Sequence, residues 1–288
     1  MAEPLIRDVS DTSFWIAHHR ALESARPDAL FRDPLAARLA GERGAKIAEA
    51  MPMPRIIGWN VVLRTCIIDD FILRAIGEGV DTILNLGAGL DTRPYRMNLP
   101  ASLRWIEADY PHIIEYKENL LAHEPPRCRL ERVKIDLADS AARRELFARV
   151  NAQAGGILVL TEGVVPYLSV EQAASLADDL RVLDRVRYWL VDYFSPQAVK
   201  YRHSRKMGRK MQNAPFKFSP GDWFAFFGQH GWQPMAIRYL TDEGERLHRP
   251  IPLPWTIKAV IRVWGAFVPK ERRDALRKFA GYVLLEPS

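Results

Sequence analysis

Residues 81–93 read DTILNLGAGLDTR, and this stretch decides the fold. Its first part, TILNL, is a short apolar run with the composition of a buried strand. The glycines that follow, Gly87 and Gly89, lack the Cβ atoms that would keep a ligand away from the backbone. A strand that runs into such a turn and then a helix is typical of the place where a nucleotide-bearing cofactor lies on an α/β sheet.

The chain on the carboxyl side of this stretch continues the alternation of strand and helix. Apolar runs at residues 104–109, 129–136, 156–163 and 187–194 are each followed by a helix-like segment. This order predicts a doubly wound, mostly parallel sheet. Two later runs, 232–240 and 281–287, are expected to pair antiparallel at one edge, which makes seven strands. Helix starts are predicted at the capping box that begins at Ser169 and at the Ser-Pro pairs of Ser195 and Ser219.

The residues before the first strand look helical. Residues 12–50 are rich in Ala, Leu and Arg and are interrupted at Pro27 and Pro34, and residues 60–76 carry apolar side chains at helical spacing. With no internal repeat or low-complexity linker, residues 1–288 are interpreted as a single domain. Its parts would be a helical N-terminal extension or lid (1–79), a cofactor-binding core (80–195) and a substrate-side region (196–288).

Composition excludes several classes of protein. Of the 288 residues, 48% are apolar and 26% are charged, which is typical of an ordinary globular chain and excludes disorder for most of its length. The apolar stretches are too short for a transmembrane segment, and the first residues do not resemble a signal peptide. The two cysteines, Cys66 and Cys128, provide neither a disulfide framework nor a metal-ligand spacing, so we expect a cytoplasmic protein without a metal site.

The formal net charge of +6 is unevenly distributed. Residues 200–210 carry six Lys or Arg and no acid, and residues 258–278 carry seven against two acids. Each run is either a solvated helix face or a site for an acidic substrate or an anionic surface. The amphipathic residues 251–269 are expected to pack as core or lid, with contact to a membrane surface as the alternative.

Acidic residues end three successive predicted strands. Asp109 and Glu107 end the second strand, where an acid accepts hydrogen bonds from ribose hydroxyls, and Asp109 is the better placed of the two. The pair Asp136-Leu137 ends the third strand and would flank an adenine, and Glu162 ends the fourth. Capping of the following helix is the alternative for Asp109 and Asp136. A dinucleotide is disfavoured because Thr92 occupies the position of a third glycine.

These motifs together resemble the leucine carboxyl methyltransferase superfamily. The resemblance covers residues 11–194 and rests on NLGAGLDTRPYR, WIEADYP, Asp136-Leu137 and TEGVVPYL, with an N-terminal SDTSFWIAHHRALESARPDALFRDPLA. The nearer branch is that of bacterial S-adenosylmethionine-dependent O-methyltransferases, which includes polyketide carboxyl methyltransferases. The resemblance implies a class I, Rossmann-like methyltransferase fold and S-adenosyl-L-methionine as cofactor.

The resemblance also implies roles for single residues. Arg64 would pair with the cofactor's carboxylate and Gly87 would line its methionine portion. Asp109 would hold the ribose, Asp136 and Leu137 the adenine, and Glu162 the amino end, through its carbonyl or its carboxylate. S-adenosylmethionine has no phosphate, so the missing third glycine does not count against it.

The expected reaction is methyl transfer to an oxygen of a small hydrophobic acceptor, acidic or phenolic, with a carboxylate favoured over a phenol. No catalytic residue is assigned. Tyr167, Arg20 and His203 are the candidates for contact with the acceptor, and for Tyr167 plain packing is the alternative. The aromatic residues 223–227 would either line an apolar pocket or belong to the core.

Two other functions remain open from the sequence. A catalytically silent protein that binds the cofactor or a partner could be built on the same fold. A nucleic-acid methyltransferase agrees with the basic charge, but the aromatic motif typical of amine methylation is matched only by Pro166-Tyr167, which disfavours nucleic acid as a partner.

Overall fold

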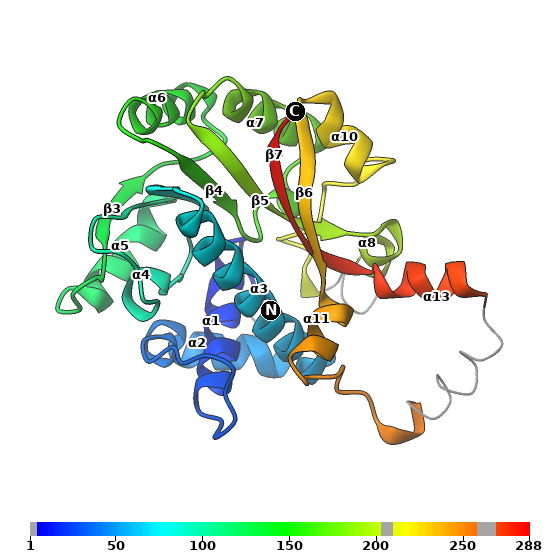
Figure 1. Cartoon of the computed structure of the whole chain (residues 1–288). Coiled ribbons are helices and arrows are strands. Elements are labelled where there is room, and N and C mark those ends of the chain that lie inside the picture. Colours follow the sequence, from blue (N-terminus) through cyan, green and yellow to red (C-terminus); the bar gives the residue numbers. More distant parts are fainter. Residues whose placement is uncertain (1–4, 203–209, 258–268) are drawn as a thin grey trace.

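The structure, a computed structural model, describes residues 5–202, 210–257 and 269–288 (Figure 1). His203, most of the basic run 200–210 and residues 258–268 of the amphipathic run lie outside these ranges. Within them, none of the helices combines the length and the apolar character that crossing a bilayer requires.

The centre of the fold is a seven-stranded sheet in the order β3-β2-β1-β4-β5-β7-β6. The first five strands are parallel, and β7 runs antiparallel to both of its neighbours, β5 and β6. The predicted mostly parallel sheet and its antiparallel terminal pair are therefore confirmed. The strands are β1 (Thr82–Leu86), β2 (Arg104–Asp109), β3 (Arg129–Lys134), β4 (Ile157–Thr161), β5 (Val186–Phe194), β6 (Trp232–Tyr239) and β7 (Ala280–Pro287).

The segment before β1 forms three helices, α1 (Asp11–Ser24), α2 (Ala36–Ala50) and α3 (Pro54–Gly77). Both Pro27 and Pro34 lie between α1 and α2, where the sequence predicts the break. The helix α3 begins six residues before the predicted residue 60. The remaining helices are α4 (Arg93–Arg96), α5 (Pro111–Leu121), α6 (Ser140–Asn151), the 3-10 turn η1 (Val165–Tyr167), α7 (Val170–Arg181), α8 (Pro196–Arg202), α10 (Trp223–Gln229), α11 (Leu240–Arg246) and α13 (Lys270–Arg277).

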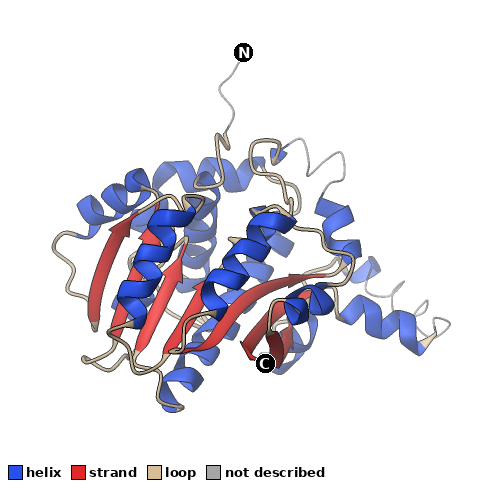
Figure 2. Cartoon of the chain, turned by 90° about the horizontal axis from the view of Figure 1, so that it is seen from above, coloured by secondary structure: helices blue, strands red, loops and turns tan. Residues whose placement is uncertain are grey.

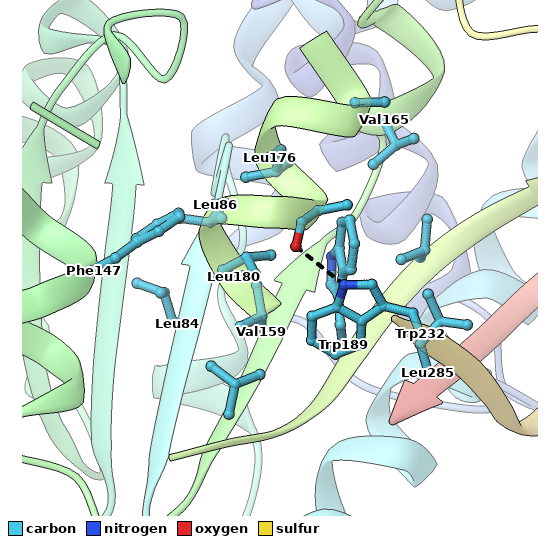
Figure 3. Close-up of a cluster of buried hydrophobic side chains, with 14 of the residues drawn as sticks. Leu84, Leu86, Phe147, Val159, Val165, Leu176, Leu180, Trp189, Trp232 and Leu285 are labelled. Carbon is cyan, nitrogen blue, oxygen red and sulfur yellow. Dashed lines mark hydrogen bonds between the residues drawn. The ribbon is translucent and has the colours of Figure 1, made fainter. Parts of the chain in front are cut away.

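Helices cover both faces of the sheet (Figure 2). Alternate strand residues point to opposite faces, so Leu84 packs with α6, α7 and α10, whereas Ile83 packs with α3. On the first face, Trp189 and Trp232 lie edge to face with ring centroids 5.3 Å apart. The indole of Trp232 donates a hydrogen bond to the carbonyl of Ala177 at 3.1 Å (Figure 3). This hydrogen bond compensates the buried indole N–H for the loss of its contact with water.

Two of the three predicted N-caps lie at the start of a helix. Ser169 forms the capping box with Gln172, and the hydroxyl of Ser195 accepts from the N–H of Ala198 at 3.2 Å, so both predictions are confirmed. The prediction at Ser219 is wrong. α10 begins at Trp223, because the Asp222 carboxylate accepts from two backbone N–H groups of the first turn, at 2.9 and 3.0 Å.

Replacing Asp222 by Ala should therefore lower the free energy of unfolding by about 1 kcal/mol, the usual cost of losing an N-cap. The matched control is Ser219→Ala, which removes the cap that the sequence alone predicts and should change stability by less than about 0.5 kcal/mol. Urea denaturation of both variants measures the difference. A larger loss for Ser219→Ala than for Asp222→Ala would contradict the assignment.

Candidate active site

A cavity of about 570 Å³ lies at the carboxyl edge of the sheet, between the ends of β1, β2, β4 and β5 and the helices α1 and α3. Its volume falls within the ~300–1,000 Å³ typical of small-molecule sites. Most of the residues for which the sequence predicts contact with cofactor or acceptor line it, with Glu107 as an exception and His203 outside the described residues: Arg20, Arg64, Gly87, Asp109, Asp136, Leu137, Glu162 and Tyr167. Six separate regions of the chain thus meet at this cavity: α1, α3 and the segments at the ends of β1, β2, β3 and β4.

Gly87 lets two turns of the chain approach each other closely. Its φ is +66°, and a Cβ atom added there would collide with Cγ2 of Val164, in the turn after β4. Its N–H donates to the carbonyl of Ala108 at 2.8 Å, which holds the turn against β2. A side chain at position 87 would be strained and would push these turns apart.

The Asp109 carboxylate is held at the cavity wall by backbone groups. Its two oxygens accept from the N–H groups of Gly89 at 2.6 Å and Tyr110 at 2.7 Å. Burial raises the pKa of Asp109, and these two N–H groups act in the opposite direction. Each oxygen keeps a lone pair that a ligand hydroxyl could use. Glu107 lies away from the cavity, because Lys117 and Arg132 pair with it inside the protein.

Asp136 and Leu137 form the end of the cavity beyond β3. Asp136 is exposed, and its carboxylate accepts from the N–H of Ala138 at 2.9 Å. Leu137 is half-buried against the core on the α6 and α7 face. The ring of Tyr110 also lines this end, and burial, followed by the charge of Asp136, raises the pKa of its phenol. Asp136 and Leu137 thus place a hydrogen-bond acceptor beside an apolar surface.

Arg64 and Glu162 pair with each other. Nε of Arg64 donates to Oε1 of Glu162 at 2.5 Å, and Nη1 of Arg93 donates to Oε2 at 2.6 Å. Burial alone would raise the pKa of Glu162, but the two guanidinium groups lower it below its usual value. Both carboxylate oxygens are thus engaged. Among the described residues Arg64 uses only its Nε in a hydrogen bond, and its Nη2 lies 3.2 Å from where a Cβ of Gly163 would be.

Arg93 joins three parts of the site. Its side chain is 2% exposed and contacts Asp69 of α3 at 2.7 Å, Asp91 after β1 at 2.9 Å and Glu162 after β4 at 2.6 Å. Because a buried charge is costly unless it is paired, this arrangement locks the relative positions of all three segments.

One acidic residue of the cavity, Asp192 on β5, was missed in the sequence. Its side chain accepts from the N–H of Gly163 at 2.7 Å, and the residue is 3% exposed. Burial raises the pKa of Asp192 to about 6, although Arg64 acts in the opposite direction. The available signal was an acid within the otherwise apolar strand segment LVDYF.

The candidates for contact with the acceptor differ in their surroundings. Tyr167 lies on η1, with its ring edge to face with Phe216 at 5.1 Å. Arg20 is buried and is held by Asp33 at 2.8 Å and by the carbonyl of Leu90 at 2.5 Å, so it anchors α1 to the turn after β1. His18 and His19, next to Arg20 in the chain, do not line the cavity, and burial lowers the pKa of His19 to about 4.

Among the described residues there is no group of three or more His, Cys, Asp or Glu suited to a metal ion.

Asp192→Asn should change how stability depends on pH. The folded carboxyl has a pKa of about 6 against an ordinary 3.8, so the folded state binds the proton more tightly than the unfolded chain. The wild type should therefore lose up to about 3 kcal/mol relative to the variant as the pH rises from about 4 to 7. Denaturant unfolding at pH 4.5 and 7.5 measures this. An identical difference between the two proteins at both pH values would contradict it.

Comparisons with known proteins agree with this geometry. The family model described as leucine carboxyl methyltransferase matches residues 13–181. A Parafrankia protein named as a candidate S-adenosyl-L-methionine-dependent methyltransferase is 32% identical, over 92% of this chain and 87% of its own. A Frankia alni protein named in the same way is 31% identical, over 84% and 90%.

Solved structures show the same fold. A candidate methyltransferase of Thermobifida fusca superposes with a TM-score of 0.56 at 14% identity, covering 95% of this chain and 94% of its own. A DUF574 family protein of Streptomyces avermitilis gives 0.53 at 13% identity, covering 94% and 97%. The expected class I methyltransferase fold is thereby confirmed. From the family match and these relatives we conclude that the chain belongs to the leucine carboxyl methyltransferase family and is an enzyme that uses S-adenosylmethionine.

Proposed function

We propose that this enzyme methylates an oxygen of a small hydrophobic acceptor, with a carboxylate preferred to a phenol. The observation that carries the proposal is Lys217, a cation on the cavity wall beside η1. The other cations of the wall, Arg20, Arg64 and Arg93, are each paired with a protein carboxylate. Within the described ranges Lys217 has only a backbone hydrogen bond, from its N–H to the carbonyl of Pro166 at 2.9 Å. Its ammonium group is free to attract an anionic acceptor.

The cavity fits S-adenosylmethionine, and we propose how it is held. Gly87 lines the cavity where we place the methionine portion, and the spare lone pairs of Asp109 suit the ribose hydroxyls. Asp136 and Leu137 suit the adenine. The Nη groups of Arg64 suit the carboxylate, because its Nε alone is spent on Glu162. Because two guanidinium groups already neutralise the Glu162 carboxylate, its backbone carbonyl is the group we assign to the cofactor's ammonium.

In this proposal the protein acts by positioning and by excluding water. The cofactor supplies a methyl group on a sulfonium. A bond forms between that carbon and an acceptor oxygen while the carbon–sulfur bond breaks, and the electron pair stays on sulfur as a neutral thioether. A carboxylate acceptor is already ionised at pH 7 and needs no base. The cavity therefore has to orient two reactants in line, which alone can supply much of the rate.

Arg64→Ala should weaken the binding of S-adenosylhomocysteine by about ten- to a hundredfold, the usual loss when a charged hydrogen-bond donor is removed. Arg64→Lys should recover only part, because a point charge cannot reproduce the guanidinium fork. Arg74→Ala is the matched control, an exposed arginine on the same helix that pairs with Glu78. Titration calorimetry gives the affinities. Equal binding by the wild type and the folded Arg64→Ala variant would remove Arg64 from the cofactor site.

The choice between carboxylate and phenol can be tested with 3-(4-hydroxyphenyl)propanoate, which offers both oxygens. We expect the methyl ester, which mild alkali hydrolyses, and a rate of the chemical step that is nearly flat from about pH 6 to 9. A phenol would instead give an alkali-stable ether and a rate that climbs with pH, or that levels off near pH 6 if Asp192 acts as its base. An N-methylated product from an amine analogue, formed faster than the ester, would overturn the oxygen assignment.

We further propose that the enzyme works in the cytoplasm, as a single domain. Cys66 and Cys128 are free thiols, and burial raises the pKa of Cys66 to about 12 and that of Cys128 to about 11. Cys66 is half-buried and Cys128 is buried, and protonated thiols without a disulfide are what a reducing compartment maintains.

A further inference from the structure

A second, smaller cavity of about 170 Å³ adjoins the first. The two cavities share four lining residues, Pro166, Asp192, Phe194 and Phe216. The partition between them therefore consists mainly of two aromatic side chains and one carboxylate. The rings of Phe194 and Phe216 have their centroids 5.3 Å apart. The two cavities thus lie on either side of the same residues, and a change of rotamer at Phe194 or Phe216 is the movement that would connect them.

The walls of the second cavity are aromatic. They include the rings of Tyr193, Phe194, Phe216, Phe218, Trp223 and Phe224. Trp223 lies edge to face with Tyr193 at 5.6 Å and with Phe224 at 5.1 Å. Of the residues 223–227, Phe226 and Phe227 lie in the buried core and line neither cavity, whereas Trp223 belongs both to that core and to the cavity wall. Such walls favour the binding of another aromatic ring, because each aromatic pair contributes about 0.5–1.5 kcal/mol beyond the effect of the surface area that it buries.

The volume also suits a ring. A dry, apolar cavity of about 150 Å³ is enough to bind benzene in other proteins. The acidic groups at its edge are already engaged, Asp192 by Gly163 and Asp222 as the cap of α10. Lys217, next to Phe216 in the chain, lines the first cavity. A cation in the first cavity, Lys217, is thus close to the aromatic walls of the second cavity.

We propose that the second cavity holds an aromatic ring of the methyl acceptor, so that the acceptor is an arylalkanoic acid. Its carboxylate lies in the first cavity near Lys217, and a short linker crosses the partition at Phe216. This inference rests on the proposed function, because it assigns the far end of the molecule whose oxygen is methylated.

The test uses the enzyme saturated with S-adenosylhomocysteine and a series from phenylacetate to 5-phenylpentanoate. In calorimetry, affinity should rise about fourfold for each added methylene until the ring is seated, the gain expected from burying that group. At the best length, the phenyl acid should bind about two- to tenfold more tightly than its cyclohexyl analogue.

Variants at Val199 link this binding to the second cavity. Val199 lies on α8 and lines the second cavity but not the first. Val199→Phe fills the space and should weaken binding of the best phenyl acid at least tenfold. Val199→Ala enlarges it and should shift the preference from phenyl to 2-naphthyl acids. Val150→Ala is the control, because it removes the same atoms from a buried valine on α6 that lines neither cavity.

The outcomes separate the two proposals. If S-adenosylhomocysteine binds normally but the phenyl acids do not bind, or bind equally well to both Val199 variants, the second cavity is not the acceptor's ring site and the proposed function still stands. If S-adenosylhomocysteine itself does not bind to the wild type, the proposed cofactor site fails and the inference fails with it. Normal product binding together with opposite effects of the two Val199 variants supports both.

Discussion

The constraint on which the rest of the site depends is the burial of the Arg93 guanidinium. A cation with 2% exposure has to be neutralised where it lies, and its three carboxylate partners come from α3, the turn after β1 and the end of β4. The helix α3 is thereby fixed to the edge of the sheet. The same contact fixes Glu162, and Glu162 orients Arg64. The direction in which Arg64 points into the cavity is thus set by a residue that need not touch any ligand.

The two sides of the cavity are built from different parts of the chain. The proposed cofactor residues lie between Arg64 and Glu162, inside the region that the family model matches, residues 13–181. Asp192, Phe216 and Lys217 lie beyond it. The proposed acceptor wall includes these later segments, whose side chains can change without disturbing Gly87 or Asp109. One fold can in this way serve many acceptors.

Most of the sheet could be predicted because parallel strands are buried on both faces and read as short apolar runs, as TILNL and ILVLT do. The position of Asp109 followed from the same reasoning, since the residue after such a strand lies at the carboxyl edge. The pairing of Arg64 with Glu162 could not be foreseen, because 98 residues separate them and only the packed fold brings them together. The start of α10 was placed at the wrong residue because Ser219 and Asp222 are both good caps, and local preference does not decide between them. Asp192 was overlooked because a charge within an apolar strand was read as part of the strand.

The position of β7 has a consequence for biosynthesis. This strand, residues 280–287, lies inside the sheet, hydrogen-bonded to β5 on one side and β6 on the other. Until those residues have left the ribosome, β5 presents an open edge and β6 has no place in the sheet. Nascent chains with such edges pair readily with one another, so the interval before the chain reaches Pro287 is the period of greatest exposure to aggregation and to chaperones. Because Ala280 and Tyr282 of β7 line the first cavity, a shorter nascent chain also lacks part of that cavity's wall.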